Sequence, residues 1–204
     1  MSIVVIDYGL GNLTSVYNAL KFLGADAKVS PSAEDLKKAD KIVLPGVGAF
    51  KDAILGLEKR NLKKAIIETL SSGKIYLGIC LGLQILFEGS EEGDTEGLGV
   101  FKGMVKRFRE KSGIKVPHIG WNAVRSQGPG SRHRIMNGIA DGSYFYFDHS
   151  YYAEPGDKGI VAATTEYGMN FTSLVRRENI FAVQFHPERS QGLGLGLLKN
   201  FIEL

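Results

Sequence analysis

The stretch Ile75-Tyr76-Leu77-Gly78-Ile79-Cys80-Leu81-Gly82-Leu83-Gln84 decides how this chain is interpreted. Its first five residues are apolar without alternation, which is typical of a strand covered on both faces in a parallel sheet. Cys80 follows at once, and residues 81–87 are predicted to form a helix. The stretch therefore predicts a sharp strand-to-helix turn with Cys80 at its apex.

The residues around Cys80 favour a reactive thiol. Gly78 and Gly82, two residues before and after it, relieve crowding at such a turn. The start of the following helix offers free amide donors and positive potential, which favour a thiolate. A lone cysteine is more often a small buried hydrophobe, and the glycine spacing is what favours the nucleophile here.

Strands and helices alternate through the first half of the chain. Apolar runs predict strands, and apolar residues at helical spacing predict helices between them. The predicted strands are 3–6, 25–29, 41–44 and 75–79, and the predicted helices are 12–23, a short one from Ser30 or Ser32, 49–57, 61–71 and 81–87. This order predicts an α/β fold, with a mostly parallel sheet and helices on both faces.

The second half is predicted to consist mainly of closely spaced strands, which favours an antiparallel extension of the sheet. The strands are expected at 98–109, 116–125, 141–147, 158–165, 171–176 and 180–185, with turns at Gly103, Ser112-Gly113, Gly128-Pro129-Gly130 and Gly168. A terminal helix is expected over 190–204. We see no linker and no repeat, so we expect a single domain over residues 1–204.

Composition narrows the classes of function. The chain has 204 residues, 44% of them hydrophobic, and a formal net charge of +3, which is too small to indicate nucleic-acid binding. A single cysteine excludes an intrachain disulfide and a cysteine metal cluster, and we expect no metal and no cofactor. The chain begins directly with a strand, without a leader or an apolar anchor, so we expect a cytoplasmic protein that does not bind membranes.

A glycine-rich motif after the first strand has a second possible interpretation. Gly9-Leu10-Gly11-Asn12-Leu13-Thr14 partly matches a dinucleotide-binding fingerprint. The third glycine is absent, and no acidic residue ends the strand expected at 25–29. Nucleotide binding is therefore disfavoured.

A second chemical motif, His186-Pro187-Glu188, follows the strand expected at 180–185. A cysteine nucleophile needs a base to deprotonate it and an acid to protonate the leaving group. A histidine does both when a carboxylate fixes its tautomer. Taken singly, His186 could equally be a structural histidine and Glu188 a solvated charge.

Together, the two motifs carry a resemblance to a known family. The pattern Gly-x-Cys-x-Gly-x-Gln with a late His-Pro-Glu resembles the class I glutamine amidotransferases. Further motifs are similar to one branch of that family, the glutaminase subunits of imidazole glycerol phosphate synthases, which act in histidine biosynthesis. These motifs are Asp7 to Leu13, Pro45 to Phe50, Pro117 to Asn122, His149 to Tyr152 and Gln184 to Ser190, and the resemblance extends from residue 3 to about 202.

The resemblance implies a role for each matching residue. Cys80 would attack the side-chain amide of glutamine, His186 would transfer protons, and Glu188 would orient His186. A glutamyl thioester would form and be hydrolysed. The implied oxyanion donors are Leu81, Val47 and Gly48, and the implied glutamine contacts are Gly46, Gln84, His149, Ser150 and Tyr151.

The resemblance also implies a partner. A chain of this length is used up by one glutaminase domain, so the ammonia acceptor must lie on another chain. The implied arrangement is a heterodimer with a (βα)8-barrel cyclase that makes imidazole glycerol phosphate and an aminoimidazole carboxamide ribotide. The expected partner face carries Asn12, Trp121, Tyr144 and Arg189. An arginine stands at 189 where lysine is usual in the family, and Trp121 has a core aromatic as its alternative.

The loop Pro45-Gly46-Val47-Gly48 suggests a means of control. Its two glycines would let the peptide at Val47 take more than one orientation, so that a partner could turn an oxyanion donor into place. The alternative is a simple tight turn.

Three rival functions stay open at this point. The first is a glutaminase subunit of another pathway, such as anthranilate, aminodeoxychorismate or pyridoxal phosphate synthesis. The second is a non-catalytic binding subunit on the same fold, and the third is a cysteine peptidase or related hydrolase on the same scaffold.

Overall fold

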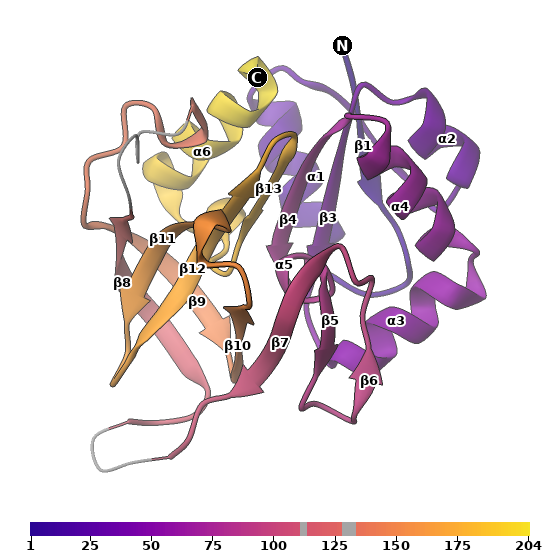
Figure 1. Ribbon diagram of the computed structural model, residues 1–204. Coiled ribbons are helices and arrows are strands. Elements are labelled where there is room, and N and C mark those ends of the chain that lie inside the picture. Colours follow the sequence, from indigo (N-terminus) through magenta and orange to yellow (C-terminus); the bar gives the residue numbers. More distant parts are fainter. Residues whose placement is uncertain (111–113, 128–133) are drawn as a thin grey trace.

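The computed structural model describes residues 1–110, 114–127 and 134–204 (Figure 1). Over these residues, nine strands form one mixed sheet in the order β2-β1-β3-β4-β13-β12-β11-β8-β9. The first five run parallel to one another and the remaining four pair antiparallel. In sheet order the strands are β2 Asp26–Ser30, β1 Ser2–Ile6, β3 Lys41–Gly46, β4 Ile75–Cys80, β13 Ile180–Val183, β12 Asn170–Arg177, β11 Val161–Glu166, β8 His118–Ser126 and β9 Ser143–His149. The predicted α/β fold with an antiparallel extension is confirmed.

Helices cover both faces of the sheet, as Figure 1 shows. One hydrophobic core lies under α2, α3 and α4, and the other lies under α1 and α6. The bounds are α1 Leu13–Phe22, α2 Ala33–Lys38, α3 Phe50–Lys59, α4 Leu62–Ser71, α5 Leu81–Gln84 and α6 Gln191–Glu203, with 3-10 helices η1 Arg134–Met136, η2 Lys158–Ile160 and η3 Pro187–Arg189.

Strand β1 shows why the parallel strands read as continuous apolar runs. Side chains alternate between the two faces of a strand. Val4 and Ile6 belong to the core under α2 to α4, whereas Ile3 and Val5 belong to the core under α1 and α6. Both faces are buried from Ile3 to Ile6, so these four positions are all apolar.

A second, smaller sheet was not predicted. Its order is β10-β7-β5-β6, with β10 Tyr151–Pro155, β7 Phe101–Arg107, β5 Phe87–Ser90 and β6 Thr95–Glu96. The helix predicted over 81–87 was wrong beyond Gln84, because Phe87 opens β5. The Leu86 and Phe87 carbonyls accept hydrogen bonds from the amides of Phe101 and Gly99 at 2.9 and 3.2 Å. These long-range bonds override the local helical pattern.

Among the predicted turns, Gly168 lies in the connection between β11 and β12 with φ +67°. The turn predicted at Gly103 was wrong: Gly103 lies inside β7 and pairs with Pro155 of β10. The turns predicted at Ser112-Gly113 and Gly128-Pro129-Gly130 lie outside the described residues. No helix in the described part of the chain is long and apolar enough to span a bilayer.

Candidate active site

Cys80 lies on a strained turn between β4 and α5. Its backbone has φ 54° and ψ −105°, a left-handed conformation that non-glycine residues rarely adopt. The turn also requires a very close approach of backbone atoms. A Cβ on Gly82 would lie 1.9 Å from the Leu44 carbonyl oxygen, and one on Gly78 would lie 2.4 Å from the Gly82 oxygen. The two glycines flanking Cys80 are therefore required by space.

His186 and Glu188 reach the same edge of the sheet from β13. Strand β13 lies parallel to β4, with Val183 beside Ile79, so both strands end on one side. The His186 side chain is 2% exposed, and its Nδ1 lies 2.8 Å from Oε1 of Glu188. The main chain is fixed as well: the His186 amide donates to the Tyr146 carbonyl, and the Ser190 hydroxyl donates to the His186 carbonyl.

The electrostatics couple His186 to Cys80. Burial lowers the pKa of His186, but the neighbouring Cys80 sulfur and the hydrogen-bonded Glu188 carboxylate together raise it by more, so the net shift is upward. With Nδ1 directed at Glu188, Nε2 is the ring nitrogen that remains for the sulfur. These neighbours therefore favour the imidazolium form of His186 beside Cys80.

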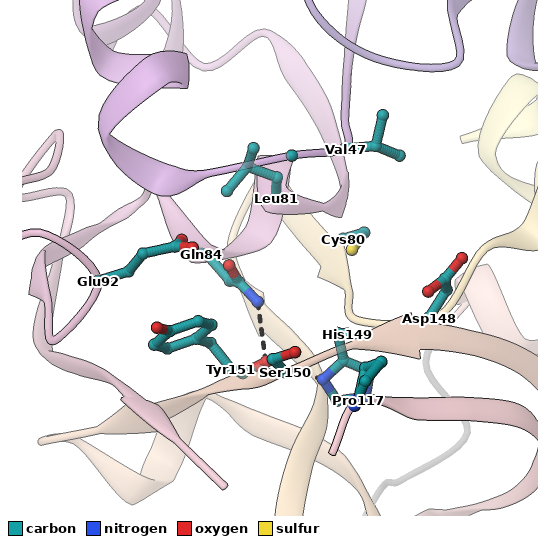
Figure 2. Close-up of a pocket in the computed structure, with 11 residues that line it drawn as sticks. Val47, Cys80, Leu81, Gln84, Glu92, Pro117, Asp148, His149, Ser150 and Tyr151 are labelled. Atoms are coloured by element: carbon teal, nitrogen blue, oxygen red, sulfur yellow. Dashed lines mark hydrogen bonds between the residues drawn. The ribbon is translucent and has the colours of Figure 1, made fainter.

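A pocket of about 360 Å³ opens at Cys80 (Figure 2). It gathers eight of the residues assigned above to catalysis, the oxyanion or glutamine, and it adds Glu92, Pro117 and Asp148. The eight are Val47, Gly48, Cys80, Leu81, Gln84, His149, Ser150 and Tyr151. His186 and Glu188 lie behind the sulfur, buried in the protein.

Gly46, assigned to glutamine binding, does not line this pocket among the described residues. It pairs with Cys80 at the end of β3, and a Cβ there would lie 2.5 Å from the Tyr8 hydroxyl oxygen. Gly46 is thus explained by close packing, whereas the loop hypothesis gave it conformational freedom. Gly48 differs, because its φ is +102° and the space beside it is open.

The polar wall of the pocket is internally hydrogen-bonded. Gln84 Nε2 donates to the Tyr151 carbonyl at 2.9 Å, drawn as a dashed line in Figure 2, and to Gln184 Oε1 at 3.1 Å. Only Oε1 of Gln84 is therefore left for a ligand. His149 Nδ1 lies 2.8 Å from the same carbonyl, and burial lowers the pKa of His149 to about 3, so this ring is neutral.

Sequence reasoning missed Glu92. This residue lines the pocket from the turn between β5 and β6, and its carboxylate accepts a hydrogen bond from the Phe50 amide at 2.7 Å. No spacing relative to Cys80 or His186 marks it in the sequence, because the small sheet that places it was itself not predicted. A contact map, not a motif, would have been needed to find it.

The residues expected at a partner face lie near one another. Trp121 and Tyr144 are 45% and 58% exposed on the paired strands β8 and β9, so the alternative of a core position for Trp121 does not hold. The Arg189 guanidinium lies 4.0 Å from the centre of the Tyr146 ring and 3.3 Å from Asp148. Asn12 immediately precedes α1, which packs beside η3 and hence beside Arg189.

Solved structures show the same fold at low identity. A crystal structure of a glutamine amidotransferase superposes with a TM-score of 0.75 at 20% identity, covering 98% of this chain and 97% of that one. The glutaminase domain of Trypanosoma brucei CTPS, solved with bound acivicin, gives a TM-score of 0.66 at 16% identity, with 100% and 94% covered. These likenesses establish the fold alone.

Sequence comparison is more specific. The family model described as glutamine amidotransferase class-I matches residues 4–204. The imidazole glycerol phosphate synthase subunit HisH of Moorella thermoacetica is 50% identical, covering 99% of this chain and 94% of the relative. The HisH subunit of Rhodopirellula baltica is 48% identical, with 98% and 96% covered. The chain therefore belongs to the class I glutamine amidotransferases and, within that family, to the HisH subunits of imidazole glycerol phosphate synthase.

Proposed function

We propose that residues 1–204 act as one glutaminase domain that hydrolyses L-glutamine to glutamate and ammonia through a thioester on Cys80. The observation that carries this proposal is the alignment of Cys80, His186 and Glu188, with 2.8 Å between the imidazole and the carboxylate. The Cys80 sulfur faces a pocket, whereas the other two side chains are buried behind it. This is the arrangement that an activated nucleophile requires.

The reaction balances with these groups alone. The Cys80 thiolate attacks the side-chain amide carbon, and the resulting tetrahedral intermediate carries an oxyanion. Protonated His186 gives its Nε2 proton to the departing nitrogen, the C–N bond breaks, and ammonia leaves a thioester. Neutral His186 then takes a proton from water, the hydroxide attacks the thioester, and the C–S bond breaks to release glutamate.

The oxyanion would be held by two backbone donors. The first is the amide of Leu81, which directly follows the nucleophile at the start of α5. The second is the amide of Val47 or Gly48, which follow Gly46 at the end of β3, beside Leu81. Val47 is 42% exposed, so this second donor belongs to a loop that a partner can reach.

Recognition of glutamine would use the polar wall. Glu92 supplies a carboxylate for the α-ammonium group, and Oε1 of Gln84 accepts a second hydrogen bond. His149, Ser150 and Tyr151 close the other side at the end of β9. Gly46 would contribute indirectly, by letting β3 approach the Cys80 turn. A pocket of about 360 Å³ suits one small amino acid.

The ammonia would pass to a (βα)8-barrel cyclase subunit that forms imidazole glycerol phosphate and an aminoimidazole carboxamide ribotide. Support comes from relatives described as subunits of that synthase and from the need to shelter ammonia from protonation by water. Asn12, Trp121, Tyr144 and Arg189 would form the docking face. We place the complex in the cytoplasm, because the Cys80 thiol must stay reduced.

The direct test is a glutaminase assay with and without a barrel cyclase and its ligand, for wild type and Cys80→Ala. Wild type should be stimulated by the cyclase, and Cys80→Ala should be inactive in both conditions. Stimulation by an anthranilate, aminodeoxychorismate or pyridoxal phosphate synthase instead would assign the chain to a rival pathway. A wild type that neither hydrolyses glutamine in the complex nor reacts with a glutamine analogue would reject the proposal.

A further inference from the structure

Gln184 places a second polar group against the reactive sulfur. It follows β13 and precedes His186 by two residues, and it is fully buried. Its Nε2 lies 3.5 Å from Sγ of Cys80, within hydrogen-bond range for sulfur. None of the steps proposed for glutamine hydrolysis uses this side chain.

The orientation of the Gln184 amide is fixed by its surroundings. The Tyr151 carbonyl can only accept, so the atom of Gln84 that lies 2.9 Å from it must be the amide nitrogen. That nitrogen also lies 3.1 Å from Gln184, so the Gln184 atom facing it must be the oxygen. The remaining amide nitrogen of Gln184 therefore faces the sulfur as a donor.

We propose that Gln184 is a positioning residue for the Cys80 sulfur, which it holds as a thiolate through an N–H···S hydrogen bond, and that Gln84 keeps the Gln184 amide in the donating orientation. This inference rests on the proposed role of Cys80 as the nucleophile. The thiolate then has two donors, the His186 imidazolium and the neutral Gln184 amide. The amide donor restrains the sulfur without competing for the proton that His186 transfers.

The chemistry of sulfur explains why such a donor matters. A neutral thiol is a weak acceptor, whereas a thiolate is a charged one, and hydrogen bonds to charged groups are about twice as strong. The donor therefore favours the thiolate over the thiol. The other titratable groups around Cys80 are His186, Tyr8 beneath the turn, and, on the pocket wall, Glu92, Asp148, His149 and Tyr151.

The test uses the full chain and two substitutions, Gln184→Glu and Gln184→Met. Cys80 is the single cysteine, so alkylation by iodoacetamide reports on this sulfur alone. The readout is the alkylation rate against pH, together with the ultraviolet absorbance of the thiolate. Neither readout needs glutamine or a partner subunit.

We expect both variants to move the acidic limb of the alkylation profile to higher pH. Gln184→Met removes the donor and should shift the limb by about one pH unit, which is about tenfold in rate below the limb. Gln184→Glu keeps the shape and still accepts from Gln84, but it turns an acceptor oxygen towards the sulfur. It should therefore shift the limb further than Gln184→Met.

Ser173→Ala is the matched control on the neighbouring strand. Ser173 is fully buried, and its backbone carbonyl accepts a hydrogen bond from the backbone amide of Gln184. Its hydroxyl has no partner among the described side chains and backbone. This variant should keep the wild-type profile. A folded Gln184→Met variant whose acidic limb is not shifted would overturn the inference. If Gln184→Glu does not fold, the result for Gln184→Met alone tests the inference. A shifted limb in a chain that lacks glutaminase activity would uphold the inference and reject the function.

Discussion

The two walls of the pocket are built differently. At the sulfur, Cys80 lines the pocket, while the side chains of His186 and Glu188 are buried and lie 2.8 Å from each other, and the His186 carbonyl accepts from the Ser190 hydroxyl. On the other wall, Val47 is 42% exposed, and Gly48 has a positive φ with open space beside it. The proposed nucleophile is thus held in buried surroundings, whereas the proposed second oxyanion donor belongs to a more exposed loop.

This difference separates the chemical step from its control. Substitutions on the buried wall should lower turnover whether or not a partner is bound. Substitutions in the Val47–Gly48 loop should act mainly on the stimulation by the partner.

The largest effect should come from Glu188→Gln. The carboxylate 2.8 Å from Nδ1 holds His186 in the tautomer that presents Nε2 to the sulfur, and an amide can stabilise the wrong one. We expect turnover in the cyclase complex to fall about a thousandfold to ten-thousandfold. Glutaminase kinetics with and without the cyclase measure this loss.

The matched control is Glu68→Gln. Glu68 forms an exposed pair with Lys64 at 3.7 Å on α4, away from the pocket, and should keep wild-type turnover. A folded Glu188→Gln that loses less than tenfold would remove Glu188 from the proposed triad.

Gly48→Ala should act on the exposed wall. A Cβ at φ +102° strains the loop and restricts the peptide at Val47. We expect the partner-stimulated rate to fall about a hundredfold, with little change in the unstimulated rate. Gly73→Ala is the control, because Gly73 also has a positive φ and open space but lies after α4. Equal stimulation in both variants would argue against control through the loop.

A smaller effect is expected for Glu92→Gln. The substitution removes the negative charge proposed to bind the α-ammonium group, while an amide oxygen can still accept from Phe50. KM for glutamine should rise about tenfold with kcat nearly unchanged. A Glu96→Gln variant on β6 serves as control, since Glu96 is exposed and does not line the pocket. A drop in kcat at unchanged KM would contradict the assignment.

The smallest effect concerns acid stability. Burial lowers the pKa of His118 from 6.5 to about 4 and that of His149 to about 3, so the unfolded chain binds more protons than the folded chain below pH 6.5. The contribution of these neutral rings to the unfolding free energy is fully present above pH 6.5. It decreases as the pH drops towards 4, by about 1 kcal/mol per pH unit for each histidine.

Denaturant titrations between pH 6.5 and 5 test this linkage. As the pH is lowered, the unfolding free energy of His118→Gln should decrease by about 1 kcal/mol less per pH unit than that of wild type. This difference in slope does not depend on the stability of the variant at neutral pH. The raised pKa of His186 does not interfere, because its contribution is fully present below 6.5. An unchanged slope would show that His118 is not buried as a neutral ring.

Much of the fold was predictable because its signals are local. The apolar runs of β1, β3 and β4 reflect burial on both faces, and the glycines around Cys80 reflect the close approach of Gly82 to Leu44 and of Gly78 to Gly82. The candidate triad was also predictable, since each half is a short motif at the end of a strand. For residues of this kind, the neighbouring positions in the sequence indicate the structural environment.

The remainder depends on contacts between distant residues. Phe87 begins β5 because the amides of Phe101 and Gly99 donate to the carbonyls of Leu86 and Phe87, and Gly103 continues β7 because β10 pairs with it. The pocket position of Glu92 depends on the same small sheet. The role of Gly46 likewise requires knowing that the Tyr8 hydroxyl lies beside it.

The position of β13 has a consequence for biosynthesis. This strand enters the middle of the large sheet, between β4 and β12, although it is the final strand of the sequence. A nascent chain therefore exposes Cys80 long before an imidazole can reach it. On the proposed mechanism, the ribosome makes the nucleophile first and its base last, so that a polypeptide still lacking His186 should not release ammonia.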